Sequence, residues 1–350
     1  MQRIREKELY QRQIRRLADS VLDWELLRDK IILITGATGM IGVFLIDVLM
    51  QRNKEFNGNI KIIAIGGNLE KAKERLGIYW SDSKFTFILH DVNEPYSQEM
   101  RNIDFIIHAA SSTHPMQYSL DPIGTINANV LGTKNLLELA SRQKACRLVF
   151  LSSVEIYGEN RGDTDFFDED YCGYINCNTL RACYTEGKRL GEALCQAYHS
   201  AKNIDVVIPR LSRTYGPSML FTDTKAISQF IKRAVQKEDI ILKSEGMQLY
   251  SYVYVADAVS AILTIMLKGE NGEAYNVADI DSNITLKNLA ECLAKLSGKK
   301  VVYELACEEE KKGYSIATKA LLDSKKLKSI GWESMYDIHE GLRQTYEMLL

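Results

Sequence analysis

The chain has 350 residues, 46% of them hydrophobic and 26% charged, with a formal net charge of −2. These values describe an ordinary globular protein, long enough for one large α/β unit or two joined lobes, and give no sign of a nucleic-acid partner. The seven cysteines form no Cys-x-x-Cys pair, so neither a disulfide framework nor a metal site is expected, and a reducing cytoplasm fits.

Residues 1–29 predict a helical extension. They carry mixed charge and have no apolar core, so they are not expected to be a signal peptide. Leu17, Val21, Trp24 and Leu27 can lie on one face of it, so we expect the extension to dock on the edge of the main domain. No apolar run is long enough to cross a membrane, and no membrane partner is expected.

A strand, a glycine-rich turn and a helix follow within residues 31–50. Residues 31–35 are almost all apolar, as expected of a central parallel strand. Gly36 permits a tight turn, Gly39 lets the backbone approach a pyrophosphate, and Gly42 lets the helix pack close to the strand. Together with the free N–H groups at the helix start, this order favours a dinucleotide site over a tight turn that binds nothing.

A second apolar strand, over residues 60–65, ends at Gly66-Gly67-Asn68. In dinucleotide-binding folds an acidic residue at this point binds the ribose hydroxyls, whereas arginine would hold a 2′-phosphate. This chain has neither, and the Asn68 amide can bond a ribose. We therefore expect NAD rather than NADP.

Strands and helices continue to alternate, which predicts a doubly wound parallel sheet of Rossmann type in the α/β class. Further strands are predicted over residues 85–89, 104–110, 148–152 and 206–211, and long helices over 125–141 and 179–199.

The helix over 179–199 carries Tyr184 and Lys188, four residues apart and so on one helical face. A lysine ammonium there lowers the pKa of the phenol, so the tyrosine can take or give a proton near neutral pH. Such a pair also occurs by chance on surface helices. Ser152 or Ser153, at the end of the preceding strand, favours catalysis because ligands bind at strand carboxyl ends in doubly wound sheets.

Five ordered motifs together resemble the extended short-chain dehydrogenase/reductases, the NAD-dependent epimerase/dehydratase family. They are the glycine turn, Asp91-Val92, His108-Ala109-Ala110, the Ser-Ser…Tyr-Gly strand end and Tyr184-x-x-x-Lys188. The resemblance implies bound NAD, a nucleotide-sugar substrate and a smaller C-terminal α/β substrate lobe. It divides the chain into a helical extension (1–29), an NAD-binding domain (30–205) and a mainly substrate-binding lobe interleaved with it (206–350).

The resemblance also assigns cofactor contacts and an assembly. The implied contacts are Gly36, Thr38, Gly39, Met40, Ile41, Gly42, Asn68, Asp91, Val92, Ala109, Ala110, Ser111, Tyr184 and Lys188, with Asp91 and Val92 near the adenine. In related enzymes the helices at 125–141 and 179–199 pair into a four-helix dimer interface. Both helices are apolar beyond one face, so a homodimer is expected; the residues concerned are Leu136, Leu137, Leu190 and Leu194.

Within the family the chain is most similar to UDP-glucuronate decarboxylases. The matching segments are 115–118, 121–125, 181–189 and 214–219. In those enzymes the strand end reads serine or threonine, a small residue and glutamate, as Ser153-Val154-Glu155 does. The 4,6-dehydratases carry aspartate where Val154 stands, and valine cannot donate a proton. The resemblance places Tyr118 and Lys225 at the substrate, with Lys225 near the nucleotide phosphates.

Two positions depart from the decarboxylase pattern. Tyr250 replaces an arginine expected near the carboxyl-bearing end of the sugar, and Arg213 replaces an asparagine. Arg213 therefore places a fixed positive charge near the pyrophosphate or the sugar, unless it forms only an internal salt bridge. We count both residues as candidate substrate contacts.

These observations predict an enzyme that remodels a nucleotide-linked hexose through transient oxidation at C4, as a UDP-glucuronate decarboxylase does. Tyr184, Lys188 and Ser153 would move the hydroxyl proton, and Glu155 would be the second acid or base. The alternatives are epimerisation at C4, or at C3 or C5 through Glu155, and less favoured 4,6-dehydration. A non-catalytic Rossmann protein that senses the cofactor is the alternative from another class.

Overall fold

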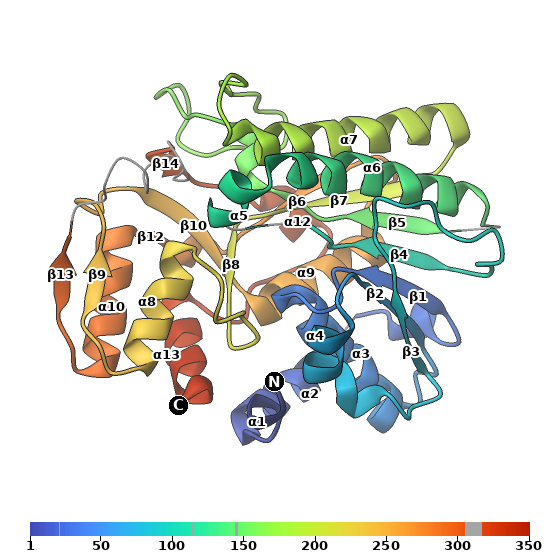
Figure 1. The fold of residues 1–350 in the computed structure, drawn as a ribbon, viewed down its shortest axis with the longest axis horizontal. Helices are drawn as coiled ribbons and strands as arrows, with labels where there is room; N and C mark the ends of the chain where they lie inside the picture. Colours follow the sequence, from blue (N-terminus) through green and yellow to red (C-terminus); the bar gives the residue numbers. More distant parts are fainter. Residues whose placement is uncertain (21, 112, 114, 144–145, 305–316) are drawn as a thin grey trace.

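The computed structural model describes residues 1–350 except 21, 112, 114, 144–145 and 305–316 (Figure 1). Within that part of the chain, eight parallel strands form a large sheet in the order β11-β7-β5-β4-β1-β2-β3, with β6 paired to β7. They are β1 (Ile31–Thr35), β2 (Lys61–Gly66), β3 (Phe85–Leu89), β4 (Phe105–His108), β5 (Arg147–Phe150), β6 (Ser152–Ser153), β7 (Asp205–Leu211) and β11 (Ala274–Val277). The order reverses between β1 and β4, where ligands bind in open α/β sheets.

Two hydrophobic cores lie on opposite faces of this sheet. Because side chains alternate along a strand, Ile32 and Ile34 of β1 join one core and Leu33 joins the other. The helices that complete the layers are α3 (Met40–Phe56) and α9 (Val255–Lys268) on the first face, and α6 (Pro122–Ser141) and α7 (Ala182–Lys202) on the second. Figure 1 shows α6 and α7 side by side along their face of the sheet.

A smaller α/β lobe lies beside the large sheet (Figure 1). In the described part of it, β10 pairs with β8, β12 and β14, and β9 pairs with β13. Arg213 lies opposite Tyr252 in the pairing of β8 with β10, so Arg213 and Tyr250 are close on neighbouring strands. Its elements are β8 (Arg213–Tyr215), α8 (Ala226–Val235), β9 (Ile240–Leu242), β10 (Leu249–Tyr254), β12 (Asn283–Thr285), α10 (Leu286–Ser297), β13 (Val301–Tyr303), β14 (Lys319–Ala320), α12 (Lys325–Ser329) and α13 (Ile338–Leu349).

The N-terminal extension contacts both parts of the molecule. Arg5 and Tyr10 donate to the buried Asp47 carboxylate of α3, over 2.8 Å from Nη2 and 2.6 Å from the phenol oxygen. Gln13 accepts a hydrogen bond from the Tyr254 hydroxyl of β10 over 3.0 Å. The extension therefore links α3 to the smaller lobe. Its elements are α1 (Gln2–Arg5), α2 (Glu8–Ala18) and a 3₁₀ turn (Trp24–Leu27).

The predicted doubly wound parallel sheet is confirmed, and most bounds differ by only a few residues. The strand predicted over 104–110 ends at His108, and α7 begins at Ala182 rather than residue 179. The remaining short elements are α4 (Leu69–Leu76), α5 (Pro115–Leu120) and 3₁₀ turns at Gly77–Tyr79, Val154–Tyr157 and Ile280–Ser282. The division at residues 29 and 205 stays a prediction. No helix of the described residues is both long and apolar enough to cross a membrane.

Candidate active site

The turn between β1 and α3 has two positions at which only glycine fits. Gly36 has a φ of 64°, and a Cβ atom there would lie 2.5 Å from the carbonyl oxygen of Ala109. A Cβ atom on Gly42 would lie 2.6 Å from the carbonyl oxygen of Gly36, so the start of α3 packs closely on the turn. Gly39 precedes α3 and offers no capping side chain, which leaves the N–H groups of the first helical turn for another acceptor. This donor set fits a pyrophosphate.

The other segments assigned to the cofactor reach the same edge of the sheet. The parallel pairing of β1 with β2 and β4, and of β2 with β3, brings the chain that follows these strands together. Thr38 is buried there. The Asn68 side-chain oxygen caps α4 by accepting a 2.8 Å hydrogen bond from the Lys71 N–H. The Asn68 amide nitrogen is therefore the group that remains to contact a ribose. The segments concerned are 36–42, 66–68, 91–92 and 109–111.

His108 joins two of these strand ends as a neutral side chain. Its Nδ1 lies 2.9 Å from the Thr35 hydroxyl, which also accepts a 3.2 Å hydrogen bond from the Ala110 N–H. Burial, helped by the charge of Lys188, lowers the pKa of His108 to about 3. The imidazole therefore carries no charge at neutral pH and serves to hold the chain beside the glycine turn.

Tyr184 and Ser153 are brought together as predicted, but the Tyr184 phenol has a different pKa. The phenol hydrogen-bonds to Ser153, and its ring stacks on Tyr118 with the centroids 4.9 Å apart. Burial raises the pKa of Tyr184 to about 12, so the predicted lowering is wrong for this structure. Lys188 donates from Nζ to the Leu151 carbonyl oxygen over 2.7 Å, and burial lowers its own pKa to about 7.

Glu155 is held between two arginines from different elements. Arg181, just before α7, donates from Nη2 to Oε2 over 2.8 Å, and Arg213 on β8 places its Nη2 3.5 Å from Oε1. Arg213 also covers Tyr250, with its Cζ 3.4 Å from the ring centroid. Burial would raise the pKa of Glu155, but the two arginines outweigh it and lower the pKa. The three groups together carry a net positive charge at neutral pH.

Each of the two arginines keeps a nitrogen without a partner. The Nη1 atoms of Arg181 and Arg213 are buried and have no hydrogen-bond partner among the described residues. An unpaired buried donor costs about 1–3 kcal/mol, so an accepting ligand oxygen would be favourable here. The internal ion pair considered for Arg213 is present, and it runs through Nη2 rather than Nη1.

Two other residues assigned to the substrate differ in their surroundings. The Arg181 guanidinium lies over the Tyr118 ring, with its Cζ 4.9 Å from the centroid, so Tyr118 belongs to the group around Tyr184. Lys225 precedes α8, and its Nζ pairs with the Asp223 carboxylate at 2.8 Å. The structure therefore gives Lys225 an acidic neighbour within its own loop.

The sequence motifs alone give Arg181 no role. It lies three residues before Tyr184, a spacing that places two helical side chains close together. Its partner Glu155 is 26 residues away along the chain, so the pairing arises only when α7 packs on the end of β6. The ion pair therefore has no local sequence signal.

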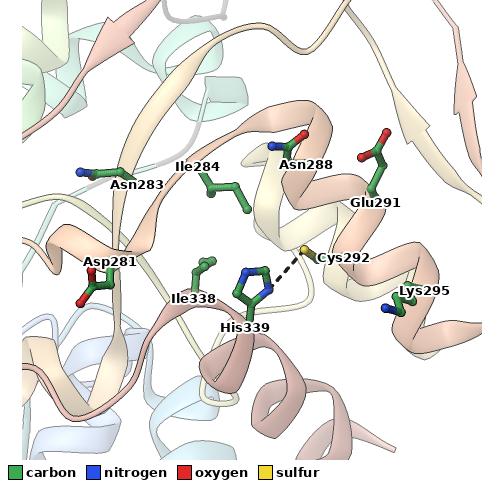
Figure 2. A pocket seen from close by; sticks show the side chains of 9 residues that line it. All are labelled: Asp281, Asn283, Ile284, Asn288, Glu291, Cys292, Lys295, Ile338 and His339. Carbon is green, nitrogen blue, oxygen red and sulfur yellow. Dashed lines mark hydrogen bonds between the residues drawn. The ribbon is translucent and has the colours of Figure 1, made fainter.

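A separate pocket of about 510 Å³ lies between α10 and α13 (Figure 2). Within it the Cys292 Sγ lies 3.5 Å from the His339 Nδ1. None of the residues predicted to bind cofactor or substrate lines this pocket, so it is distinct from the candidate active site. Among the described residues, no group of three or more His, Cys, Asp or Glu side chains could hold a metal ion.

Comparison with known proteins places the chain in a family. Residues 32–278 match the model of the NAD dependent epimerase/dehydratase family. UDP-glucuronic acid decarboxylase 6 of Arabidopsis thaliana is 33% identical over 311 residues, which cover 89% of this chain and 86% of that protein. UDP-glucuronic acid decarboxylase 1 of Danio rerio is 31% identical over 91% of this chain and 72% of its own length.

Solved structures share the fold at lower identity. UDP-glucuronic acid 4-epimerase of Bacillus cereus, in complex with UDP-glucuronic acid and NAD, has a TM-score of 0.76 at 20% identity, covering 91% of this chain and 98% of that one. The epimerase Mth375 of Methanothermobacter thermautotrophicus has a TM-score of 0.79 at 19% identity and covers 95% of both chains.

The chain belongs to the NAD dependent epimerase/dehydratase family. It is therefore an enzyme that uses NAD, which sets aside the alternative of a non-catalytic cofactor sensor. The expected cofactor and the resemblance to the extended short-chain dehydrogenase/reductases are confirmed.

Proposed function

We propose that this enzyme converts UDP-glucuronate to a UDP-pentose by oxidation at C4 and loss of the C6 carboxylate. The observation that carries the proposal is the pair of arginines around Glu155, each with a buried Nη1 that has no hydrogen-bond partner in the described part of the chain. A carboxylate taken out of water needs a cation, since an anion desolvated without one costs several kcal/mol. The decarboxylases among the relatives support the choice of substrate.

Arg213 takes the place of the arginine that the decarboxylase pattern has where this chain has Tyr250. Because β8 and β10 are paired neighbours, a side chain from Arg213 reaches across the ring of Tyr250. The guanidinium thus stands beside the position that the missing arginine would occupy. The two departures from the pattern are explained together as one relocated cation.

The chain's own groups perform the proton transfers. Ser153 and Tyr184 present hydroxyls to the C4 hydroxyl of the sugar, and Lys188, on the same helical face as Tyr184, supplies a positive charge. The glycine turn at residues 36–42 would hold NAD, which would supply a hydride acceptor for the oxidation at C4 and a hydride donor for the final reduction. A ketone at C4 makes the C6 carboxylate that of a β-keto acid, and Arg213 holds this carboxylate in place. Carbon dioxide leaves as the electrons of the C5–C6 bond pass into an enolate at C4, and C5 takes up a proton from solvent before C4 is reduced again.

A second candidate, epimerisation next to the ketone, draws support from Glu155. Its lowered pKa favours the carboxylate form, which can remove a proton from carbon. In this case Arg213 would serve the pyrophosphate of a neutral nucleotide hexose. Dehydration is disfavoured because Val154, buried at the strand end, has no proton to give.

The variant Arg213→Ala separates these two roles. We expect it to abolish turnover of UDP-glucuronate while binding of UDP-glucose, measured by titration calorimetry, changes little. Equal weakening of binding for both nucleotide sugars would instead place Arg213 at the pyrophosphate and contradict the proposal. Arg161→Ala, which removes an arginine that lies over the exposed ring of Tyr174, is the matched control.

We further propose a homodimer formed through α6 and α7. Leu190 is 49% exposed, as such an interface requires, but Leu136 and Leu137 are fully buried against the sheet, so their predicted place on it is wrong. Leu194 also packs against that core. The exposed apolar residues of α6 are Ile123, Ile126 and Leu131. A monomer mass by light scattering at micromolar concentration would contradict the dimer.

We also propose that the protein is cytoplasmic, as its cysteine usage suggests. The support for this location is the chain's odd number of cysteines, and the six described ones are free thiols. Fractionation of cells that produce the protein tests it.

A further inference from the structure

Glu192 is a partly buried acid that the proposed mechanism does not use. It lies four residues after Lys188 and eight after Tyr184 on α7, so the three side chains share one helical face. Its side chain is 12% exposed. A carboxylate this far from water must be held by partners, and Glu192 has them on two other elements.

Two residues of neighbouring strands hold the Glu192 carboxylate. The hydroxyl of Ser152 on β6 donates to its Oε1. Arg210 on β7 donates from Nη2 to Oε2 over 2.7 Å and from Nε to Oε1 over 3.1 Å. The ion pair is charge-assisted and two-pronged, which fixes the position of the carboxylate as well as its charge.

The side chains of Lys188 and Glu192 hydrogen-bond to consecutive residues of the chain, Leu151 and Ser152. The Lys188 ammonium donates to the carbonyl oxygen of Leu151, and Glu192 accepts from the side chain of Ser152. The ammonium also lies 4.8 Å from the centre of the Phe150 ring. The two charged groups therefore lie side by side on α7. Both are held by the two residues that precede Ser153.

Among the charged and titratable groups around Lys188, Glu192 is the one that carries a negative charge. On α7 these groups are Tyr184, Glu192 and Cys195, and from β4 the neutral His108 faces the ammonium. Burial lowers the pKa of Lys188 to about 7, whereas Glu192 and Cys195 oppose this lowering. Burial raises the pKa of the Cys195 thiol, so the thiol stays uncharged near neutral pH and Glu192 supplies the negative charge.

We propose that Glu192 is a positioning residue that keeps Lys188 charged and aimed at the active site, with Arg210 setting how strongly it does so. This rests on the proposed role of Lys188 but not on which nucleotide sugar is processed. Arg210 draws on the same carboxylate as Lys188 does, so the two cations compete for its charge. Removing the Glu192 carboxylate and removing the Arg210 guanidinium should therefore shift the pKa of Lys188 in opposite directions.

Titration of the enzyme tests this directly, without substrate. The probe is the ¹³Cε signal of Lys188 in protein labelled with ¹³C-lysine, assigned by its loss in Lys188→Met. In Glu192→Gln we expect the pKa of Lys188 to fall by about one unit or more, and in Arg210→Gln to rise. The alkaline limb of the pH profile of kcat should move in the same directions, because activity is lost as Lys188 loses its proton.

Glu186→Gln is the matched control, since it removes an acid from the same helix whose own partner, Arg189, is 3.8 Å away and partly exposed. It should leave the Lys188 titration unchanged. An unchanged titration in Glu192→Gln, or shifts of the same sign in both variants, would overturn the proposal. If Glu192→Gln does not fold, Arg210→Gln decides alone, and a lowered or unchanged pKa there overturns it. Shifts as expected without any sugar turnover would support the role of Glu192 and refute only the proposed substrate.

Discussion

Arg181 donates to Glu155 over 2.8 Å and so ties the start of α7 to the strand end that carries Ser153. This ion pair keeps Glu155 ionised although its surroundings alone would favour the neutral acid. The same guanidinium covers Tyr118, which stacks on Tyr184. One arginine therefore influences both the charge of Glu155, the proposed second acid or base, and the packing around Tyr184, the proposed catalytic residue.

The variant Arg181→Met should raise the pKa of Glu155, because burial then acts with only Arg213 opposing it. If the carboxylate is the active form, activity is lost as pH falls through this pKa, so the acid limb of kcat/KM should move to higher pH. The pH profile of the purified variant measures the shift. Lys202→Met, which removes a half-exposed cation of the same helix, is the control. An acid limb that stays in place would show that Glu155 is not the group that titrates.

Replacement of Tyr184 by phenylalanine should keep the fold and the cofactor but reduce turnover at least about a hundredfold, the usual scale for a general acid–base group. The ring that stacks on Tyr118 is retained, and only the hydroxyl that bonds Ser153 is lost. Steady-state kinetics and a thermal melt with and without NAD separate the two effects. Near-normal product formation would refute the catalytic assignment.

NAD should bind more tightly than NADP. The loop after β2 offers Gly67 and Asn68, and neither supplies a cation for a 2′-phosphate. The Asn68 side-chain oxygen is already used to cap α4, which leaves an amide donor suited to a ribose hydroxyl. Titration calorimetry on protein stripped of cofactor measures both affinities, and equal or tighter binding of NADP would be the contrary result.

The N-terminal extension should stabilise the fold mainly through Asp47. This carboxylate is 3% exposed and accepts from Arg5, Tyr10 and Tyr79. Asp47→Asn breaks a buried ion pair and should lower the free energy of unfolding by about 3 kcal/mol. Urea unfolding at pH 7 measures the change.

Glu55→Gln provides the control for Asp47→Asn, because Glu55 lies on the same helix and pairs with Arg15 of the same extension at the surface. Exposed ion pairs contribute little, so this variant should unfold nearly as the native protein does. Equal effects of the two substitutions would show that burial of Asp47 is not what anchors the extension.

The sequence predicted features that depend on local pattern and missed those that depend on packing. The apolar residues before Gly36 and the spacing of the glycines were enough to predict β1, the turn and the start of α3. The direction of the Tyr184 pKa was missed because burial of the phenol, to which the stacked Tyr118 ring contributes, raises the pKa more than the Ser153 hydrogen bond lowers it. Leu136 was misplaced because α6 is apolar on two faces, and only the fold shows which of them covers the sheet.

Incubation of the enzyme with UDP-glucuronate and NAD, with released carbon dioxide and the nucleotide-sugar mass both recorded, decides whether the enzyme is a decarboxylase. We expect carbon dioxide and a UDP-pentose in equal amounts, with NAD not consumed. No release of carbon dioxide from UDP-glucuronate, together with epimerisation of a neutral nucleotide hexose such as UDP-glucose, would contradict the proposal.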